Sequence, residues 1–485
     1  MTRNNQITAN PGFFRFKKVN HKYLLTNETG DFIFLKESEF DKFVNNKLSL
    51  KNKVAVKLNK LNFLKQPYSI EKAVVKYRSR NNFLFSQGPS LHIIVLTLRC
   101  NHSCLYCQAA SCAVDTKEKD LDKRKAKKIV DFIFSIPSKD IAIEFQGGEP
   151  LLNWPVLKFI IDYACKKNKT LKKNLQLRLV SNFSLLDESK LKFFFDNNVS
   201  LCTSLDGPRE VHDKNRILFN KQSHKKVSFW LKRVFEEYNK RVNRKKNPYI
   251  YYPGAVLTVS RHSLKYPREI VDEYVKWGFN NIPIRPVNSF GLAKERWKKV
   301  GYSSEEFLRF YKKVLNYIIS LNQNGVILKE AVAGVMLQKI LTDKSTGFLD
   351  LRSPCGAGIG QLLYNYDGSI YSCDEGRMVG DDIFKLGDIE QDNYQNVITG
   401  SKTKSLCLAS CLENNICDLC VYKPYCGTCP VDNYVIHKNI FVYPSLSDRC
   451  KINKGIFDYL FTLLQNQQKV KVLKQWIDKN ELLKI

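Results

Sequence analysis

The fold is indicated by one stretch of sequence, Leu91-His92-Ile93-Ile94-Val95-Leu96-Thr97-Leu98-Arg99-Cys100-Asn101-His102-Ser103-Cys104-Leu105-Tyr106-Cys107. Residues 91–98 are mostly apolar and follow the breakers Gly88-Pro89-Ser90, which predicts a buried strand. The cysteines then follow at a Cys-x3-Cys-x2-Cys spacing, on a loop at a strand's carboxyl end, where α/β folds place their chemistry. Three thiolates there can ligate three irons of a [4Fe–4S] cube and leave the fourth open. Cys112 could close the site instead.

Size and cysteine content narrow the class of protein. A chain of 485 residues predicts about two to four domains. No apolar run approaches the ~18 residues that a membrane-spanning helix needs, and the first residues lack the apolar core of a signal peptide. We therefore expect a cytoplasmic protein with no membrane partner. In that reducing compartment, fifteen cysteines favour metal ligation over disulfides.

The formal net charge of +31 has two readings. Basic stretches such as Lys225-Lys226, residues 241–246 and Lys469-Val470-Lys471 could attract nucleic acid or an acidic peptide. The sequence holds no compact stripe of arginines and aromatics and no nucleic-acid motif. We expect solvated basic surfaces, with attraction of an acidic peptide as the next alternative and no nucleic-acid partner.

Strand and helix patterns alternate from Ser90 to about Val300, which predicts parallel strands with helical crossovers. The six repeats predict an α/β fold, a partial (β/α)6 barrel that resembles an incomplete TIM barrel. The expected strands are Leu91–Leu98, Ile141–Gln146, Leu175–Ser181, Val199–Ser204, Ala255–Val259 and Asn281–Pro286. The expected helices are Leu121–Ser135, Trp154–Lys167, Asp187–Asn197, Lys225–Tyr238 and Pro267–Gly278.

Residues 1–88 predict a small α+β unit. The expected strands are Phe13–Lys18, His21–Thr26 and Asp31–Leu35, with a turn at Asn27–Gly30 and helices at Glu37–Asn46, Lys53–Leu64 and Ile70–Ser79. This unit is too small to bury much alone, so we expect it to dock on the next domain or on its own helices. It is either a structural extension or a peptide-recognition element, since an exposed strand edge can take an added peptide strand.

A second motif, Gln146-Gly147-Gly148-Glu149-Pro150, follows the second barrel strand. Paired glycines let the backbone approach a ligand closely, and Glu149 can accept hydrogen bonds from an ammonium group. Alone, the motif is equally compatible with a plain turn. Because the motif lies one strand after the cysteine loop, we interpret it as part of a ligand-binding site rather than as a plain turn.

The C-terminal third carries further cysteines at metal-site spacing. A hairpin signal at Tyr366–Ser369 lies between two of them, and structural zinc is the alternative to iron–sulfur clusters. We assign Cys165 and Cys202 to packing. The C-terminal series is Cys355, Cys373, Cys417, Cys420, Cys426, Cys429 and Cys450.

The first two motifs resemble those of the radical S-adenosylmethionine (SAM) enzymes. Cys100, Cys104 and Cys107, with Tyr106, resemble the family signature, and Gly147–Pro150 resembles the motif for the methionine amino group. The resemblance implies a [4Fe–4S] cluster whose open iron is chelated by the amino and carboxylate groups of SAM. Cys112 is then a bystander.

A third segment, Leu205-Asp206-Gly207-Pro208 with His212-Asp213 and Arg216, resembles the peptide-maturing members. The likeness implies that Ser204 and Asp206 line the pocket, that Arg216 pairs with the SAM carboxylate, and that Ser181-Asn182 contact the ribose. Asp206 is the candidate catalytic acid or base, with a binding or turn role as the alternative.

The C-terminal cysteines resemble the SPASM domain of peptide-modifying radical SAM enzymes, which carries two auxiliary [4Fe–4S] clusters. The resemblance assigns one cluster to Cys417, Cys420, Cys426 and Cys450, and part of the other to Cys355, Cys373 and Cys429. Its fourth ligand stays open between Cys407, Cys411 and an uncoordinated iron.

Longer stretches are similar to the radical SAM maturase of the His-Xaa-Ser peptide system. Among them are Gly88–Ile93, Glu144–Asn153, Tyr364–Gly368, Asp374–Met378 and Pro424–Gly427. The likeness implies reductive cleavage of SAM to a 5′-deoxyadenosyl radical, which crosslinks or oxidises a precursor peptide. It also implies an electron donor such as flavodoxin or ferredoxin, and a second radical SAM maturase as a partner. The alternatives are a sulfatase-type or other radical SAM maturase and, from another class, a zinc-cluster nucleic-acid-binding protein.

The expected domains follow from these motifs. In chain order they are the N-terminal unit at 1–88, the radical SAM partial barrel at 89–300, bridging helices at 301–345, the SPASM domain at 346–455 and a helical tail at 456–485.

Overall fold

The computed structural model describes residues 8–65, 70–82, 88–219, 222–243, 251–413, 416–442 and 447–477. Within these ranges, no helix is long and apolar enough to cross a membrane. Residues 244–246 of the basic stretch 241–246 and the last residues of the predicted helical tail, 478–485, lie outside the described residues.

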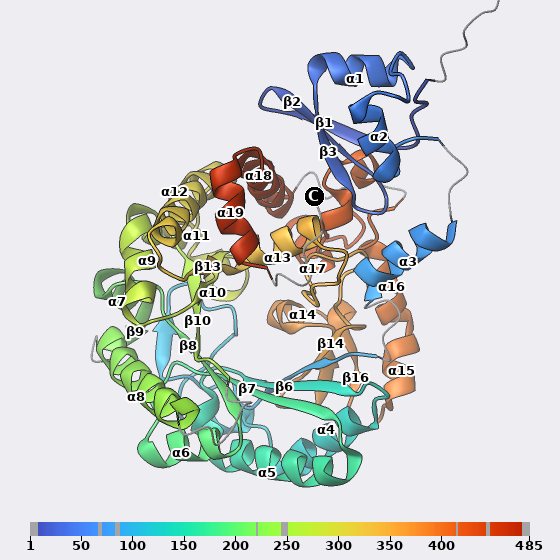
Figure 1. Ribbon diagram of the computed structural model, residues 1–485. Helices are drawn as coiled ribbons and strands as arrows, with labels where there is room; N and C mark the ends of the chain where they lie inside the picture. Colours follow the sequence, from blue (N-terminus) through green and yellow to red (C-terminus); the bar gives the residue numbers. More distant parts are fainter. Residues whose placement is uncertain are drawn as a thin grey trace, which may run out of the picture.

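A curved sheet of nine strands forms the centre of the molecule (Figure 1). Parallel strands follow one another in chain order across most of it, which confirms the predicted partial barrel. These strands are β4 (Leu91–Val95), β6 (Asp140–Gln146), β7 (Asn174–Val180), β8 (Val199–Ser204), β10 (Gly254–Val259) and β12 (Ile284–Pro286).

The last predicted barrel strand is divided in the structure. β11 (Asn281–Ile282) leaves the sheet and pairs with β13 (Lys329–Glu330), and only β12 joins β10. Pro283 stands between β11 and β12, and a proline cannot donate to a strand ladder. The expectation of one continuous strand over 281–286 was therefore wrong.

Helices cover the outer face of the barrel sheet (Figure 1). In α4, apolar residues at helical spacing, including Ala126, Ile129 and Ile133, face the core, and the Asp122 carboxylate caps the helix by accepting from the Lys125 amide. The covering and bridging helices are α4 (Lys123–Ser135), α5 (Trp154–Leu171), α6 (Glu188–Asp196), α8 (Ser223–Asn243), α9 (Pro267–Lys276), α12 (Ser304–Gln323) and α13 (Ala331–Leu341).

The C-terminal cysteine-rich region continues the barrel sheet. Its predicted hairpin forms from β14 (Gln361–Tyr364) and β15 (Ser369–Tyr371), and β14 also pairs in parallel with β4. β16 (Lys385–Asp388) completes the sheet. Every residue of β14 is buried, so this strand needs a partner on both edges, and one of them is the strand that leads to Cys100.

The N-terminal unit has a core of its own. It contains β1 (Arg15–Val19), β2 (Lys22–Thr26) and β3 (Phe32–Lys36) in one antiparallel sheet, with α1 (Glu37–Val44), α2 (Lys53–Lys60) and α3 (Ile70–Arg80).

The N-terminal unit docks on the C-terminal part of the chain rather than on the barrel that follows it in sequence (Figure 1). Thr26 Oγ1 donates to the Val421 carbonyl at 2.8 Å, and Tyr425 Oη donates to the Gly30 carbonyl at 3.0 Å. Phe32 packs edge-on against Phe461 of α18 (Asp448–Leu463).

The predicted helix pair of the tail is present as α18 and α19 (Gln467–Gln475), and it packs on α12. The remaining short elements lie around the site or in the cysteine-rich region. They are β5 (His102–Cys104), α7 (Arg209–Asn215), β9 (Arg216–Leu218), α10 (Gly291–Glu295), α11 (Trp297–Val300), α14 (Asp374–Val379), α15 (Tyr394–Thr399), α16 (Ser401–Ala409) and α17 (Pro430–His437).

Candidate active site

The cysteine loop is held by backbone contacts from three parts of the chain. Strand β5 pairs with β9, so that Cys104 lies opposite Arg216. The Cys107 carbonyl accepts from the Leu292 amide at 3.0 Å. At the base of the loop, the Cys100 amide donates to the Cys112 carbonyl at 3.1 Å. Cys112 therefore closes the loop through its backbone.

Cys100, Cys104 and Cys107 line one cavity at the carboxyl ends of the barrel strands, as the sequence predicted. The cavity measures about 1630 Å³ including its open mouth. Alternate residues of the parallel strands point into it, because side chains in a strand alternate between faces. They are Glu144, Gln146, Arg178, Val180, Ser200, Cys202, Ser204, Val256, Thr258 and Arg285. Cys202, which we had assigned to packing, is thus part of the cavity wall.

Gly147 and Gly148 also line the cavity, but the reason for glycine differs from the one expected. A Cβ at Gly147 would lie 2.2 Å from the Thr97 carbonyl oxygen, and one at Gly148 would lie 2.2 Å from that of Arg99. Gly147 also has a φ of +150°. The paired glycines therefore let the turn after β6 pack directly against the backbone that leads into the cysteine loop.

The Glu149 carboxylate is already occupied by protein donors. It is 0% exposed and accepts from the Leu151 amide at 3.0 Å, Ser181 Oγ at 2.8 Å and the Asn182 amide at 2.9 Å. Burial raises its pKa to about 6. The expectation that Glu149 offers its carboxylate to a ligand ammonium is not met in this structure, because its hydrogen bonds join the Gly-Gly-Glu-Pro turn to the end of β7.

Ser181 and Asn182 line the cavity beside this turn. The Asn182 side-chain amide donates to Asn101 Oδ1 at 3.0 Å and lies 2.9 Å from His102 Nδ1. Asn182 therefore ties the end of β7 to the cysteine loop. Its expected contact with a ribose remains a prediction.

Asp206 lies behind the cavity wall, so the expectation that it lines the pocket is wrong. It is 0% exposed and accepts from Asn215 Nδ2 at 3.2 Å, from Arg216 Nε at 3.1 Å and from Tyr106 Oη. The Arg216 guanidinium also lies over the Tyr106 ring, 5.4 Å from its centroid. This buried group anchors Tyr106, between two of the predicted cluster cysteines, to the end of β8. Asp206 is thus placed to position the loop rather than to exchange protons with a substrate.

The loop thiols need a nearby cation in order to ionise. Burial raises the pKa of Cys100, and it raises that of Cys104 to about 12 although the Arg216 charge lowers it. Both are neutral thiols at physiological pH unless a cation holds them as thiolates, which iron does.

The C-terminal region supplies a wall of the cavity that the sequence did not predict. Asp374, Glu375 and Met378 of α14 line it, and Arg377 Nη2 donates to the Ala109 carbonyl at 3.0 Å. Burial and the Asp374 charge raise the pKa of Glu375 to about 8. The signal in the sequence that could have identified the α14 residues is their position directly after Cys373. Among the residues that the structure describes, three bring a carboxyl group to the cavity: Glu144, Asp374 and Glu375. Asp206 does not.

Cys355 and Cys373 belong to one buried cluster of side chains, and the partly buried Cys429 packs against that cluster. The Cys373 sulfur accepts from the Gly376 amide at 3.3 Å, and the Cys429 sulfur accepts from the Asp432 amide at 3.5 Å. Each sulfur thereby caps a helix, α14 or α17. Amide donors of this kind stabilise thiolates.

A second cavity, of about 650 Å³ including its open side, brings together Cys417, Cys420, Cys426 and Cys450, and Cys429 lines it as well. Cys407 and Cys411 lie at the end of α16, where Cys411 Sγ donates to the Cys407 carbonyl at 3.4 Å. The identity of the fourth ligand beside Cys355, Cys373 and Cys429 remains open.

In the part of the chain that the structure describes, no group of three or more His, Cys, Asp or Glu side chains converges on one point as the ligands of a single metal ion do. The ligands of a [4Fe–4S] cluster do not converge on one point, because each thiolate binds a different iron. The donors at all three cysteine groups are sulfur, which is the ligand set of iron–sulfur clusters.

Comparison with known proteins agrees with this site. Residues 94–252 match the model of the Radical SAM superfamily. An uncharacterized protein of Methanocaldococcus jannaschii is 28% identical over 282 residues, covering 58% of this chain and 83% of its own. A cysteine-type anaerobic sulfatase-maturating enzyme of Clostridium perfringens is 23% identical over 381 residues, which cover 76% of this chain and 95% of that enzyme.

The solved structure of native anSMEcpe with bound AdoMet and Cp18Cys peptide has the same fold. It superposes with a TM-score of 0.64 at 20% identity, covering 80% of this chain and 99% of that one. Fold, cavity and family model agree: residues 94–252 match the Radical SAM superfamily, and the fold that contains them is shared with the anSMEcpe structure and continues into the cysteine-rich region.

Proposed function

We propose that this chain is a radical SAM enzyme that modifies a ribosomally made peptide or protein. The observation that carries the proposal is the single cavity in which Cys100, Cys104 and Cys107 meet Gly147 and Gly148. Three cysteine thiols that line one cavity, in the segment that matches the Radical SAM model, support a [4Fe–4S] cluster with one iron open to SAM. When bound, these groups would supply an electron and a 5′-deoxyadenosyl radical that removes a hydrogen atom from the substrate.

The chain's own residues would hold the cofactors in place. Arg216 reaches the cavity from β9, and we propose that it pairs with the SAM carboxylate while Ser181 and Asn182 contact the ribose. Ser204 lies on the same wall. The buried Asp206 keeps Arg216 and Tyr106 in position.

Two auxiliary clusters form part of the proposal. Cys417, Cys420, Cys426 and Cys450 would hold one, and Cys355, Cys373 and Cys429 would hold the other with an unassigned fourth ligand. Because α14 begins directly after Cys373 and lines the cavity, the second of these would lie beside the substrate. It would then be placed to take up an electron after the substrate radical reacts.

Three observations support a peptide as the substrate. The cavity is large and open, the similar anSMEcpe structure holds a peptide together with AdoMet, and the net charge of +31 attracts acidic chains. We propose a precursor of the His-Xaa-Ser type, with flavodoxin or ferredoxin as electron donor and a second radical SAM maturase as a partner. The N-terminal unit is the proposed recognition element for that peptide. The reaction would take place in the cytoplasm.

A sulfatase-type maturation is the second candidate, and the similarity to sulfatase-maturating enzymes favours it. The two can be separated by offering the anaerobically reconstituted enzyme, SAM and a low-potential reductant with two peptides. One is a His-Xaa-Ser-rich precursor, and the other is a cysteine peptide with a sulfatase-type sequence. Mass spectrometry that shows loss of two hydrogen atoms from the first alone supports the proposal. Reaction of the cysteine peptide alone would replace it with the second candidate.

A further inference from the structure

A separate cavity beside the auxiliary-cluster cysteines is rich in cations. It lies between the N-terminal unit, α13 and the cysteine-rich region, and its lining includes Arg80, Lys339, Arg352, Lys423 and Cys426. Cys426 is a predicted ligand of the cluster that Cys417, Cys420 and Cys450 complete. Among the cationic side chains of this cavity, Lys339 is the one whose surroundings point to a role.

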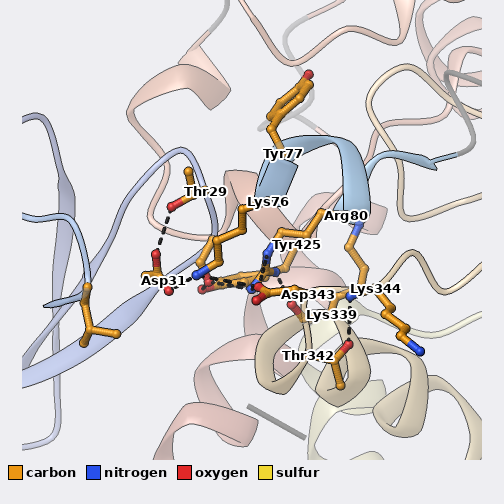
Figure 2. Close-up of polar contacts among 12 residues, drawn as sticks. Thr29, Asp31, Lys76, Tyr77, Arg80, Lys339, Thr342, Asp343, Lys344 and Tyr425 are labelled. Carbon is orange, nitrogen blue, oxygen red and sulfur yellow. Dashed lines mark hydrogen bonds and ion pairs between the residues drawn. The ribbon is translucent and has the colours of Figure 1, made fainter. Parts of the chain in front are cut away.

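Lys339 is fixed in place by hydrogen bonds at both ends. Its ammonium donates to the Leu351 carbonyl, and its own carbonyl accepts from Arg80 Nη1 at 2.7 Å. Figure 2 shows Lys339 with Arg80 and Asp343, to the right of Thr29 and Asp31 of the N-terminal unit. Nζ is thereby held at the segment 349–352.

The segment 349–352 passes between the cysteines of the two predicted clusters. A Cβ at Gly427, next to Cys426, would lie 2.5 Å from the Asp350 carbonyl oxygen. On the other side, Cys355 Sγ donates to the Leu349 carbonyl at 3.7 Å. Lys339, bound to this segment, therefore places its charge near Cys426.

Two other cations of the cavity, Arg80 and Lys423, are balanced by carboxylates. Arg80 pairs with Asp343 at 3.0 Å, and Lys423 pairs with Asp418 at 2.5 Å and lies 3.6 Å from both Glu28 and Glu413. Arg352 is 7% exposed, and the negative charges of Cys355 and Asp350 favour its charged form.

Within the described ranges, Lys339 has no carboxylate within ion-pair distance. Burial lowers its pKa to about 7, and a thiolate at Cys426 counteracts this. A negative charge at Cys426 would therefore favour the charged form of Lys339, which no described carboxylate offsets.

We propose that Lys339 sets the reduction potential of the auxiliary cluster held by Cys417, Cys420, Cys426 and Cys450. This inference rests on the proposed function, because it presupposes that the cluster is present. Reduction adds one negative charge to the cluster, and a nearby cation in a low-dielectric site stabilises that charge. Lys339 thus favours the reduced form and makes the cluster a better electron acceptor.

The test is a redox titration of the full-length, anaerobically reconstituted protein, followed by electron paramagnetic resonance. The signal of this cluster is identified by its loss in Cys420→Ala. Lys339→Gln keeps a hydrogen-bond donor and removes the charge, and we expect it to lower the reduction equilibrium constant about tenfold, which is about 59 mV for one electron. Lys339→Arg keeps the charge and should titrate as the wild type does.

Lys454→Gln is the matched control. Lys454 also lies at the cavity of Cys417 and Cys450, but its side chain is exposed, so water and salt screen its charge. A smaller shift in this variant is expected, and a shift equal to that of Lys339→Gln would overturn the proposal.

Two further results are decisive. An unchanged midpoint in Lys339→Gln would contradict a role for the charge. If Lys339→Gln loses the cluster, its retention in Lys339→Arg supports the charge, and its loss in both variants would show that Lys339 serves packing alone. Absence of cluster iron from the wild type would instead overturn the proposed function.

Discussion

At the scale of single residues, the structure separates side chains that face the cavity from those that hold it together. Glu149 and Asp206 both belong to motifs that predicted ligand contact, yet both are 0% exposed and bonded to protein donors. A sequence motif identifies a position but not the direction of its side chain. The same carboxylate can bind a ligand or accept hydrogen bonds from backbone amides of the protein. The cysteines were predictable, since thiols at that spacing have few other uses.

Replacing Asp206 by Asn should destabilise the protein strongly without removing a catalytic proton. The change leaves the buried Arg216 charge unpaired, which typically costs about 3–5 kcal/mol. Asp162→Asn is the control, because Asp162 forms an exposed pair with Lys158 that contributes about 1 kcal/mol at most. Urea denaturation measures both. A stable Asp206→Asn variant that cleaves SAM but has a shifted pH–rate profile would favour a proton-transfer role.

Glu149 should make stability fall as pH rises through its titration range. Burial raises its folded pKa to about 6 from 4.5, so between these values the folded state binds more protons than the unfolded state. Its contribution to stability is therefore fully present below about pH 4.5, is lost as pH rises to about 6, and amounts to about 2 kcal/mol. Denaturation of the wild type and Glu149→Gln across this range measures it. A wild-type curve parallel to that of Glu149→Gln would contradict the assignment.

At the scale of elements, the alternation of strand and helix patterns predicted the barrel well. Periodicity and turn residues are local signals, and most barrel elements begin and end within a few residues of their predicted bounds. The split at Pro283 and the pairing of β14 with β4 were missed. Pairing between strands about 270 residues apart depends on packing that no local pattern records.

The contribution of α14 to the cavity leads to a prediction at this scale. Asp374→Asn should leave SAM cleavage intact but reduce peptide modification, because Asp374 lines the cavity on a different element from the cysteine loop. A loss of about 10²–10⁴-fold in modification would match the removal of a general acid or base. 5′-Deoxyadenosine and modified peptide are measured in the same reaction. An equal loss of both products would indicate that α14 supports the cluster loop instead.

At the scale of the whole molecule, the N-terminal unit, the barrel and the cysteine-rich region meet more closely than their order in the sequence implies. The N-terminal unit contacts residues 421–425, next to Cys426, and the cysteine-rich region extends the barrel sheet and lines the cavity. The domain boundaries stay a prediction from composition and motifs. The packing of these parts against one another could not be predicted, because it depends on apolar contacts such as Phe32 with Phe461.

The basic surface should make peptide binding depend on salt. With a net charge of +31, association with an acidic precursor is strengthened by long-range attraction, which salt screens within about 8 Å at physiological ionic strength. We expect the Kd of the precursor to rise at least severalfold between 50 and 500 mM salt, as measured by fluorescence anisotropy. A precursor whose acidic residues are changed to Gln is the control and should bind with little salt dependence. Equal salt dependence for both peptides would assign the basic residues to solubility alone.

The central claim is that Cys100, Cys104 and Cys107 hold the cluster that cleaves SAM. The most direct measurement is 5′-deoxyadenosine formation by the anaerobically reconstituted wild type, Cys104→Ala and Cys112→Ala. Wild type and Cys112→Ala should both form the product, since Cys112 contributes its backbone to the loop. Cys104→Ala should form none and should lose about four of the roughly twelve irons that three clusters hold. A Cys104→Ala variant that forms 5′-deoxyadenosine at the wild-type rate would contradict the account.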